Sequence, residues 1–439
     1  MFENPFTLNS FQTYLTPLKN SLFYFTAVGI NRGMPFLLIP LLTNIMTVEE
    51  YGYISLASVA ISLLKNFIGL NPSLFVIAKY FKYSRNELSQ YISGILCLVA
   101  VTLFIGGGLV FILNEAIGFA PGLSPIIIAA ITFPSAFMVV EALALTILQM
   151  ERRAEKFFLY SFISALLQLL FVIVLVVNLR TGWQGKITGD FLASLLICLL
   201  LLGNLIKKGY VARIFDKNKL KDFFTFSFPL LPHSLSLWTM NFMDRFLITF
   251  FCGVQAIGLY SAAYNVGMGL MLLYDALQRV WQPYFFEYLE KESYSAKLSI
   301  VRWTWLYYLF CIFVFVLSVF VVAWITPWIF GEAFRSAYVY IPLIFLGYTF
   351  HGMYRAVAGY LYHLKMNALL AKITFTSALI NTVLNIILIN ANCPIGAAQS
   401  TAITFFFSFV VVQLIVIKKY DMPWFSFGDL FKRPLKNIG

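Results

Sequence analysis

Charged side chains are scarce in this chain. Only 11% of its 439 residues are Asp, Glu, Lys or Arg, whereas 60% are hydrophobic. A soluble globular domain carries about 25% charged residues, because its surface must face water. A water-soluble fold is therefore excluded, and we expect the lipid bilayer to be the solvent for most of the chain.

Catalytic and metal-binding motifs are also missing from the sequence. It contains no P-loop, HExxH, CxxC or Ser-His-Asp pattern, so we expect no metal, no cofactor and no enzymatic activity. The cysteines are scattered, mostly in or beside apolar runs, and we interpret them as small packing residues. They are Cys97, Cys198, Cys252, Cys311 and Cys393.

Long apolar runs predict an all-α membrane protein of twelve spanning helices. A helical span needs about 20 mainly apolar residues. The expected spans are 19–44, 51–77, 88–113, 123–147, 157–178, 187–206, 223–250, 257–283, 300–326, 337–360, 369–390 and 395–417.

The distribution of basic residues predicts the orientation of these spans. With the amino terminus inside, 23 of the 31 Lys and Arg residues fall in cytoplasmic segments and three in outer loops. Cytoplasmic loops retain Lys and Arg, so we expect both termini in the cytoplasm and the chain in the cell inner membrane. This distribution also accounts for the net charge of +12 without a nucleic-acid partner.

The two halves of the chain carry similar segments. Gly52, Ser55 and Ala57 open the second span, and Gly258, Ser261 and Ala263 open the eighth at a constant offset. Because each repeat holds six spans, both copies have the same orientation, which is a transporter architecture with a cavity between two lobes. We expect an N-terminal lobe at 1–206, a cytoplasmic linker at 207–222, a C-terminal lobe at 223–417 and a basic cytoplasmic tail at 418–439.

Eight charged residues lie well inside the expected spans rather than near their ends, and a charge at the bilayer centre costs about 2.5–3.5 kcal/mol. Five are cations and three are acids, and this excess of positive charge favours an anionic substrate such as a phosphate. The cations are Arg32, Lys65, Arg245, Arg279 and Arg355, and the acids are Glu141, Asp244 and Asp275.

Structural roles stay open for these side chains. Asp275 and Arg279 are spaced to neutralise one another on one helix face, and Arg355 can extend to the inner interface. Arg245 can pair with Asp244, and Glu141 with Lys65 or Arg32. Trp238 is a candidate for stacking on a sugar ring, with helix packing as the alternative. His233 and His351 lie inside spans, and we expect packed neutral imidazoles there.

Several motifs resemble those of the bacterial polysaccharide (O-antigen) flippases of the MATE-like exporter superfamily. The first two spans read Arg32-Gly-Met-Pro-Phe-Leu-Leu-Ile-Pro40 and Thr47-Val-Glu-Glu-Tyr-Gly52. The seventh and eighth carry Asp244-Arg245, Ile257-Gly-Leu-Tyr-Ser261 and Trp281-Gln-Pro283. The last two carry Asn381-Thr-Val-Leu-Asn385 and Pro394-Ile-Gly396.

The resemblance implies flipping of an undecaprenyl-diphosphate-linked oligosaccharide from the inner to the outer leaflet by alternating access. It also implies a MATE-like fold with a cationic central cavity, coupling to a proton or sodium gradient, and a polymerase and chain-length regulator as partners besides membrane lipid. By this resemblance the five cations bind substrate, and Asp244, Asp275 and Glu141 are candidates for ion coupling.

Two alternatives remain beside the flippase. A multidrug exporter of the same fold needs an acid-rich cavity for cationic drugs, which the excess of cations disfavours. A membrane polysaccharide polymerase or ligase usually carries a large outer loop, and the outer loops expected here are short.

Overall fold

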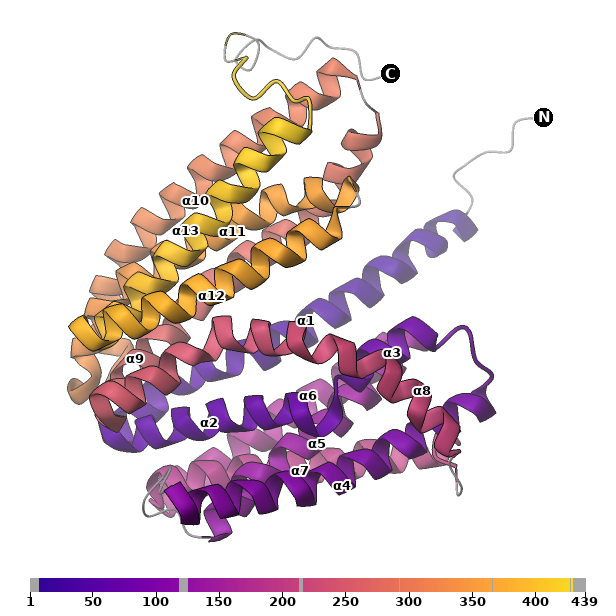
Figure 1. The fold of residues 1–439 in the computed structure, drawn as a ribbon, viewed down its shortest axis with the longest axis vertical. Coiled ribbons are helices and arrows are strands. Elements are labelled where there is room, and N and C mark those ends of the chain that lie inside the picture. The colour runs from indigo at the N-terminus through magenta and orange to yellow at the C-terminus, as the bar shows by residue number, and fades with distance from the viewer. Residues whose placement is uncertain are drawn as a thin grey trace. The chain divides into compact units, whose positions relative to one another are not determined.

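A computed structural model describes residues 8–117, 125–212, 216–291, 293–364, 366–426 and 428 (Figure 1). Every regular element within these ranges is a helix, because backbone groups in lipid must be satisfied within their own segment. In chain order the elements are α1 (Leu8–Ile45), α2 (Val48–Gly69), α3 (Pro72–Lys79), α4 (Arg85–Ile117), α5 (Pro125–Met150), α6 (Ala154–Phe171), η1 (Val172–Asn178), α7 (Gly182–Lys207), α8 (Lys217–Ser227), η2 (Phe228–Leu230), α9 (Leu231–Glu290), α10 (Tyr294–Ile329), η3 (Glu332–Tyr340), α11 (Ile341–His363), α12 (Asn367–Asn392) and α13 (Pro394–Lys419).

The helices account for the expected spans. Ten helical stretches among the described residues are long and apolar enough to cross a membrane. One of them, Lys217–Glu290, contains both the seventh and the eighth expected span, which meet where Gly253 departs from helical geometry. The tenth expected span corresponds to α11, which lies outside those ten stretches. The chain is therefore a multi-pass membrane protein.

Local side-chain chemistry sets the starts of two of these helices. Before α2, the Glu50 carboxylate accepts hydrogen bonds from the backbone N–H and hydroxyl of Thr47, and the Thr47 hydroxyl accepts from the N–H of Glu50. Ser84 and Glu87 repeat the arrangement before α4. Such a capping box satisfies backbone donors that the first turn of a helix leaves unpaired.

The chain forms two compact units, and the first consists of Met1–Leu37 and Tyr53–Trp238. Within it α5 packs against α7 and α4 against α5 (Figure 1). The aromatic centre joins Phe75 of α3 to Tyr91 of α4 and Phe223 of α8, with ring centroids 5.1 and 5.3 Å apart. This packing holds α8 within the first unit, although only the short element η2 separates it from the long element α9.

A polar network holds the ends of α5 and α7 together in the first unit. Glu151 forms an ion pair with Lys208 and accepts a hydrogen bond of 2.9 Å from the Tyr210 hydroxyl, which also contacts the Tyr80 hydroxyl at 2.9 Å. Burial opposes ionisation of Glu151, but Lys208 and Tyr210 outweigh it and lower the pKa of this carboxyl below its usual value. Burial and the neighbouring Tyr80 and Glu151 raise the pKa of Tyr210.

The second unit consists of Leu38–Gly52 and Thr239–Gly439, so the end of α1 and the start of α2 pack with segments far along the chain. Thr43 anchors this early segment, because its hydroxyl accepts a hydrogen bond from the Gly331 N–H at 3.1 Å. The Asn265 side chain donates to the Tyr51 hydroxyl at 3.0 Å. Glycine is needed at residue 331, since a Cβ there would lie 2.1 Å from the Thr43 carbonyl oxygen.

A ladder of small polar side chains joins α12 to α13 in the second unit. Ser377 and Ser408 share a hydrogen bond of 2.8 Å, and Ser400 donates to the Asn381 carbonyl at 3.1 Å. Asn385 donates to the Asn381 side chain at 3.0 Å. Small and polar residues let helices approach closely in lipid, where apolar burial gives little driving force between them.

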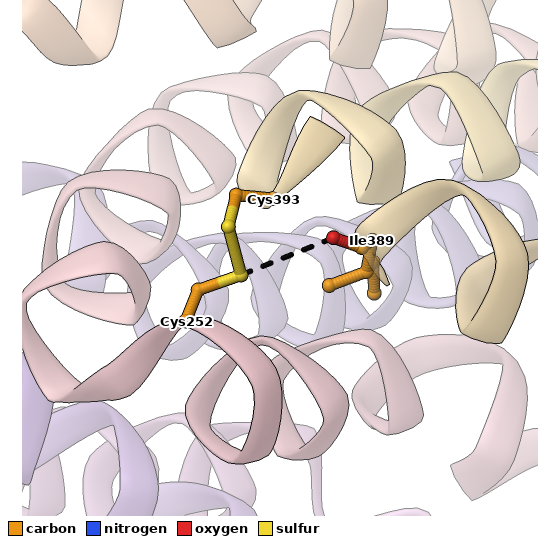
Figure 2. The surroundings of a disulfide bond; sticks show 3 residues. All are labelled: Cys252, Ile389 and Cys393. Carbon is orange, nitrogen blue, oxygen red and sulfur yellow. Dashed lines mark hydrogen bonds between the residues drawn. A yellow bond between two sulfur atoms is a disulfide. The ribbon is translucent and has the colours of Figure 1, made fainter. Parts of the chain in front are cut away.

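Two of the five cysteines form a disulfide in the second unit, so the prediction that all five are packing residues is wrong. Cys252 is bonded to Cys393, with their Cα atoms 5.9 Å apart (Figure 2). Of the three free cysteines, Cys198 and Cys311 are buried as expected, whereas Cys97 is exposed. Sequence spacing gives no signal for this bond, because 141 residues separate the partners.

Candidate functional site

The first unit places Lys65 and Glu141 near one another on neighbouring helices. Both side chains are partly buried, Lys65 on α2 and Glu141 on α5. They interact electrostatically, and Glu141 also interacts with the Ser164 hydroxyl of α6. A cation and an acid that interact in a weakly hydrated site lower each other's desolvation cost, and a direct pairing of Glu141 with Lys65 stays a prediction.

Two further predicted residues belong to the first unit. Arg32 lies in the middle of α1, and its side chain is outside the described residues, so its role stays a prediction. Trp238 is half-buried at the end of the unit and donates its indole N–H to the Ser62 hydroxyl of α2 at 2.9 Å. This bond orients the indole ring.

In the second unit, Asp244 and Arg245 form the centre of a buried aromatic cluster. Their exposed fractions are only 5% and 6%. The Arg245 guanidinium lies 4.1 Å from the ring centroid of Tyr264 and donates to the Asn241 carbonyl oxygen at 2.7 Å. Asp244 accepts a hydrogen bond of 2.6 Å from the Tyr260 hydroxyl. Both charges are thus satisfied within the second unit.

A second charged group in this unit lies further along α9. Asp275 is buried on α9 and forms an ion pair with Arg355 of α11, whose side chain is 35% exposed. Arg279 follows Asp275 by one helical turn, but its side chain is exposed and makes no hydrogen bond or ion pair with any described residue. Asp275 therefore neutralises Arg355 across the two helices, and Arg279 is left as the surplus cation. The predicted i, i+4 pairing of Asp275 with Arg279 is not the ion pair that the fold forms.

The fold brings side chains to these charges that sequence spacing alone does not connect with them. His351 lies one turn before Arg355 on α11, packs its ring 4.7 Å from that of Phe405, and has a buried Nδ1 without a partner among the described residues. Tyr260 and Tyr264, the ring partners of Asp244 and Arg245, are spaced i, i+4 on the far side of the Gly253 break. That spacing was a usable signal, but only the fold places it opposite residues 244 and 245.

Comparisons with known proteins identify the family of the chain. The family model described as "Polysaccharide biosynthesis protein" matches residues 17–289, which is more than half of the chain. The chain belongs to the polysaccharide biosynthesis protein family. This family member is 22% identical over 374 residues to the "Lsg locus putative protein 1" of Haemophilus influenzae, with 82% of this chain and 88% of the relative covered.

Solved structures of two kinds share the fold of this polysaccharide biosynthesis protein. A lipid II flippase MurJ in an inward closed conformation matches with a TM-score of 0.73 and 16% identity, over 90% of this chain and 87% of that one. An inward-facing multidrug resistance MATE family transporter matches with a TM-score of 0.63 and 13% identity, over 88% and 95%. The MATE-like, all-helical fold predicted from the sequence is thus confirmed.

Proposed function

We propose that this polysaccharide biosynthesis protein is a flippase for an undecaprenyl-diphosphate-linked oligosaccharide, an O-antigen or related repeat unit. It moves the lipid-linked sugar from the inner to the outer leaflet of the cytoplasmic membrane by alternating access. The family assignment and the MurJ-like fold support this class of substrate.

The surplus cation on α9 carries the proposal. Asp275 is engaged by Arg355, so the positive charge of Arg279 has no acid to balance it among the described residues. A guanidinium binds phosphate oxygens through paired N–H donors, and such charge-assisted bonds are about twice as strong as neutral ones. An anionic diphosphate therefore fits this group better than a cationic drug does.

Three further cations are assigned to substrate binding, each within its own unit. In the first unit they are Arg32 and Lys65, because charges inside spans face a polar group or a substrate. In the second unit Arg355 contributes when the substrate competes with Asp275 for its guanidinium. We assign Arg245 a supporting role instead, because the Asn241 carbonyl oxygen and the Tyr264 ring already satisfy its guanidinium.

Ion coupling completes the proposed cycle. Among the acids, Asp275 is placed best for it, because release of Arg355 to a phosphate exposes a carboxylate that then needs a proton or a sodium ion. Asp244 and Glu141 are the other candidates. The flipped product becomes the substrate of a polymerase and its chain-length regulator, which are the partners implied by this proposal. Trp238 is assigned to stacking on the sugar.

Deletion of the gene tests the function directly. A flippase predicts that complete lipid-linked repeat units accumulate on the inner leaflet, as shown by leaflet-selective enzymatic labelling of their sugars. Single units that accumulate on the outer leaflet would indicate a polymerase. Unchanged lipid-linked sugars together with increased sensitivity to cationic drugs would indicate a multidrug exporter. Either of these results would overturn the proposal.

A further inference from the structure

The disulfide joins two places where the helical backbone of the second unit is interrupted. Cys252 directly precedes Gly253, whose φ of 84° and ψ of 176° end the first part of α9. Cys393 has a φ of 52° and separates α12 from α13. Figure 2 shows the bond between these interruptions, with Cys252 Sγ 4.0 Å from the carbonyl oxygen of Ile389 near the end of α12. The bond thus fixes the turn in α9 to the turn between α12 and α13.

The distribution of charge predicts the compartment that contains both turns. With the termini inside, residues 251–256 and 391–394 fall in outer loops. Disulfides form and persist in oxidising compartments such as the periplasm and are rare in the cytosol. The bonded pair and the charge bias are independent observations, and both place these turns outside the cytoplasm.

A reciprocal helix crossing lies directly beside the bond. A Cβ on Gly52 would lie 2.2 Å from the Val254 carbonyl oxygen, and a Cβ on Gly258 would lie 2.0 Å from the Val48 carbonyl oxygen. Val48 and Gly52 occupy the same positions in the first repeat that Val254 and Gly258 occupy in the second. The starts of the two repeat-related helices therefore touch through backbone atoms, which only glycine permits.

The position of Val254 depends on the turn that the disulfide holds. Val254 follows Cys252 by two residues, and the intervening Gly253 has no atom within 4 Å of the place where its Cβ would be. The place of a side chain at residue 253 is therefore open, and its positive φ is one that glycine adopts without strain. A backbone contact as close as the one between Val254 and Gly52 tolerates little displacement.

We propose that Cys252 and Cys393 are an oxidation site for an extracytoplasmic thiol–disulfide oxidoreductase, and that their bond positions residues 254–258 against residues 48–52. In this role the bond holds the backbone of residues 254–258 in contact with the start of α2. The proposal stands independently of the substrate that the protein carries.

The oxidation balances as a thiol–disulfide exchange. One cysteine thiolate attacks a sulfur of the oxidoreductase disulfide and forms a mixed disulfide. The thiolate of the other cysteine then attacks the sulfur of the first, which forms the Cys252–Cys393 bond and releases the oxidoreductase as a dithiol. The two electrons and the two protons of the cysteine pair end on that dithiol.

Counting free thiols tests the oxidation. Protein from membranes is quenched in acid, denatured and treated with a maleimide-coupled polymer that shifts its mobility once per thiol. We expect three tags before reduction and five after it, because three cysteines are free in the structure. We expect five tags without reduction in cells that lack the extracytoplasmic oxidoreductase. Five tags in normal cells would overturn the bond, and three tags in the deficient cells would overturn the oxidation route.

Hydrogen exchange tests the positioning role. In the Cys252→Ser, Cys393→Ser variant, we expect amides of residues 47–52 and 254–258 to exchange about tenfold faster, because local opening costs less when the link is absent. The α12–α13 ladder around Asn381 should keep its protection. The matched control is Cys97→Ser, which removes an exposed free thiol.

If the double variant fails to fold, reduction of the wild-type protein in nanodiscs replaces it. Faster exchange confined to residues 250–253 and 390–396, with residues 47–52 unchanged, would overturn the positioning role. The bond would then only tie its own two turns together.

Discussion

Arg245 and Arg279 lie on the same element, α9, yet their surroundings are opposite. Arg245 is 6% exposed, stacks on Tyr264 and donates to a backbone carbonyl, and its own backbone N–H donates to the preceding acid Asp244. Arg279 is exposed and has no ion-pair partner among the described residues, because the nearby Asp275 pairs with Arg355 of α11.

The surroundings of a charge inside a span decide whether it supports the fold or is available to bind a substrate. Removing a side chain from a satisfied buried pair leaves the partner charge uncompensated, so such a pair is structural whatever else it does. An unbalanced cation costs free energy in the resting protein, and it recovers that free energy when an anion binds. The same residue type therefore supports the fold at one end of α9 and is available to a substrate at the other.

The largest expected effect is on stability, at residue 245. Arg245→Ala should lower the free energy of unfolding by about 3–5 kcal/mol, because it leaves Asp244 buried without its cation. Thermal unfolding of the purified protein in detergent measures the change. The Asp244→Asn, Arg245→Met variant removes both charges and should recover most of the loss. A single variant as stable as the wild type would show that Arg245 does not support the fold.

The next effect is on transport, at residue 279. Arg279→Ala should reduce flipping about tenfold to a hundredfold, since a charge-assisted contact is worth about 1.5–3 kcal/mol. Its stability should stay within about 0.5 kcal/mol of the wild type, as for other exposed positions. Flipping by the purified protein in liposomes that contain undecaprenyl-diphosphate-linked sugar measures the loss.

Two variants control for the Arg279 measurement. Arg279→Lys should retain part of the activity, because it keeps the charge but loses the paired donors. Arg335→Ala removes an arginine that is half-exposed in η3, where it pairs with Glu332, and should have little effect. Equal losses of flipping for Arg279→Ala and Arg335→Ala would show that Arg279 has no special role in transport.

Asp275→Asn should release Arg355 from its ion pair and make this second guanidinium available to the substrate. The freed guanidinium should increase apparent affinity for the lipid diphosphate severalfold, which corresponds to about 1 kcal/mol for a partly exposed pair. Turnover should fall and lose its dependence on the ion gradient, because the product is held and no carboxylate is exposed. KM and kcat measured with and without proton and sodium gradients separate these effects. An unchanged gradient dependence would contradict the coupling role.

The smallest effect is expected at the polar network in the first unit. The lowered pKa of Glu151 means that the ionised carboxylate stabilises the folded state. This contribution is present above its ordinary pKa of 4.5 and is lost as the pH falls through the lowered folded value. Glu151→Gln should remove about 1 kcal/mol near neutral pH and flatten the stability profile below pH 4.5. Thermal unfolding between pH 3 and 7 measures this pH dependence. An unchanged loss of stability in acid would show that Glu151 does not contribute to it.

Much of the fold followed from local properties of the sequence. Apolar length predicts where helices span, as the matches of α4, α10 and α13 to expected spans illustrate. Gly52 and Gly258, which the sequence relates by a constant offset, also make equivalent close contacts in the structure. Both signals are local, since a helix closes its backbone hydrogen bonds within a few residues.

The partners of the charges were not predictable in the same way. The i, i+4 spacing of Asp275 and Arg279 suggested a pair on one helix, whereas the fold brings Arg355 of α11 to the acid instead. Helical spacing reports which residues share a face, and it carries no information about the helix that covers that face. The predicted roles of Arg32 and Lys65 stay predictions for the same reason.

The sequence by itself determined that this protein lives in the bilayer, that it is helical, and that it carries more positive than negative charge inside its spans. Only the tertiary structure decided which charges neutralise one another, that Cys252 meets Cys393, and that residues 38–52 pack in the second unit. The difference lies in the sequence separation over which each interaction acts. Hydrophobicity and helix formation are sums over neighbouring residues, whereas an ion pair or a disulfide requires two atoms from distant segments to meet within a few ångströms.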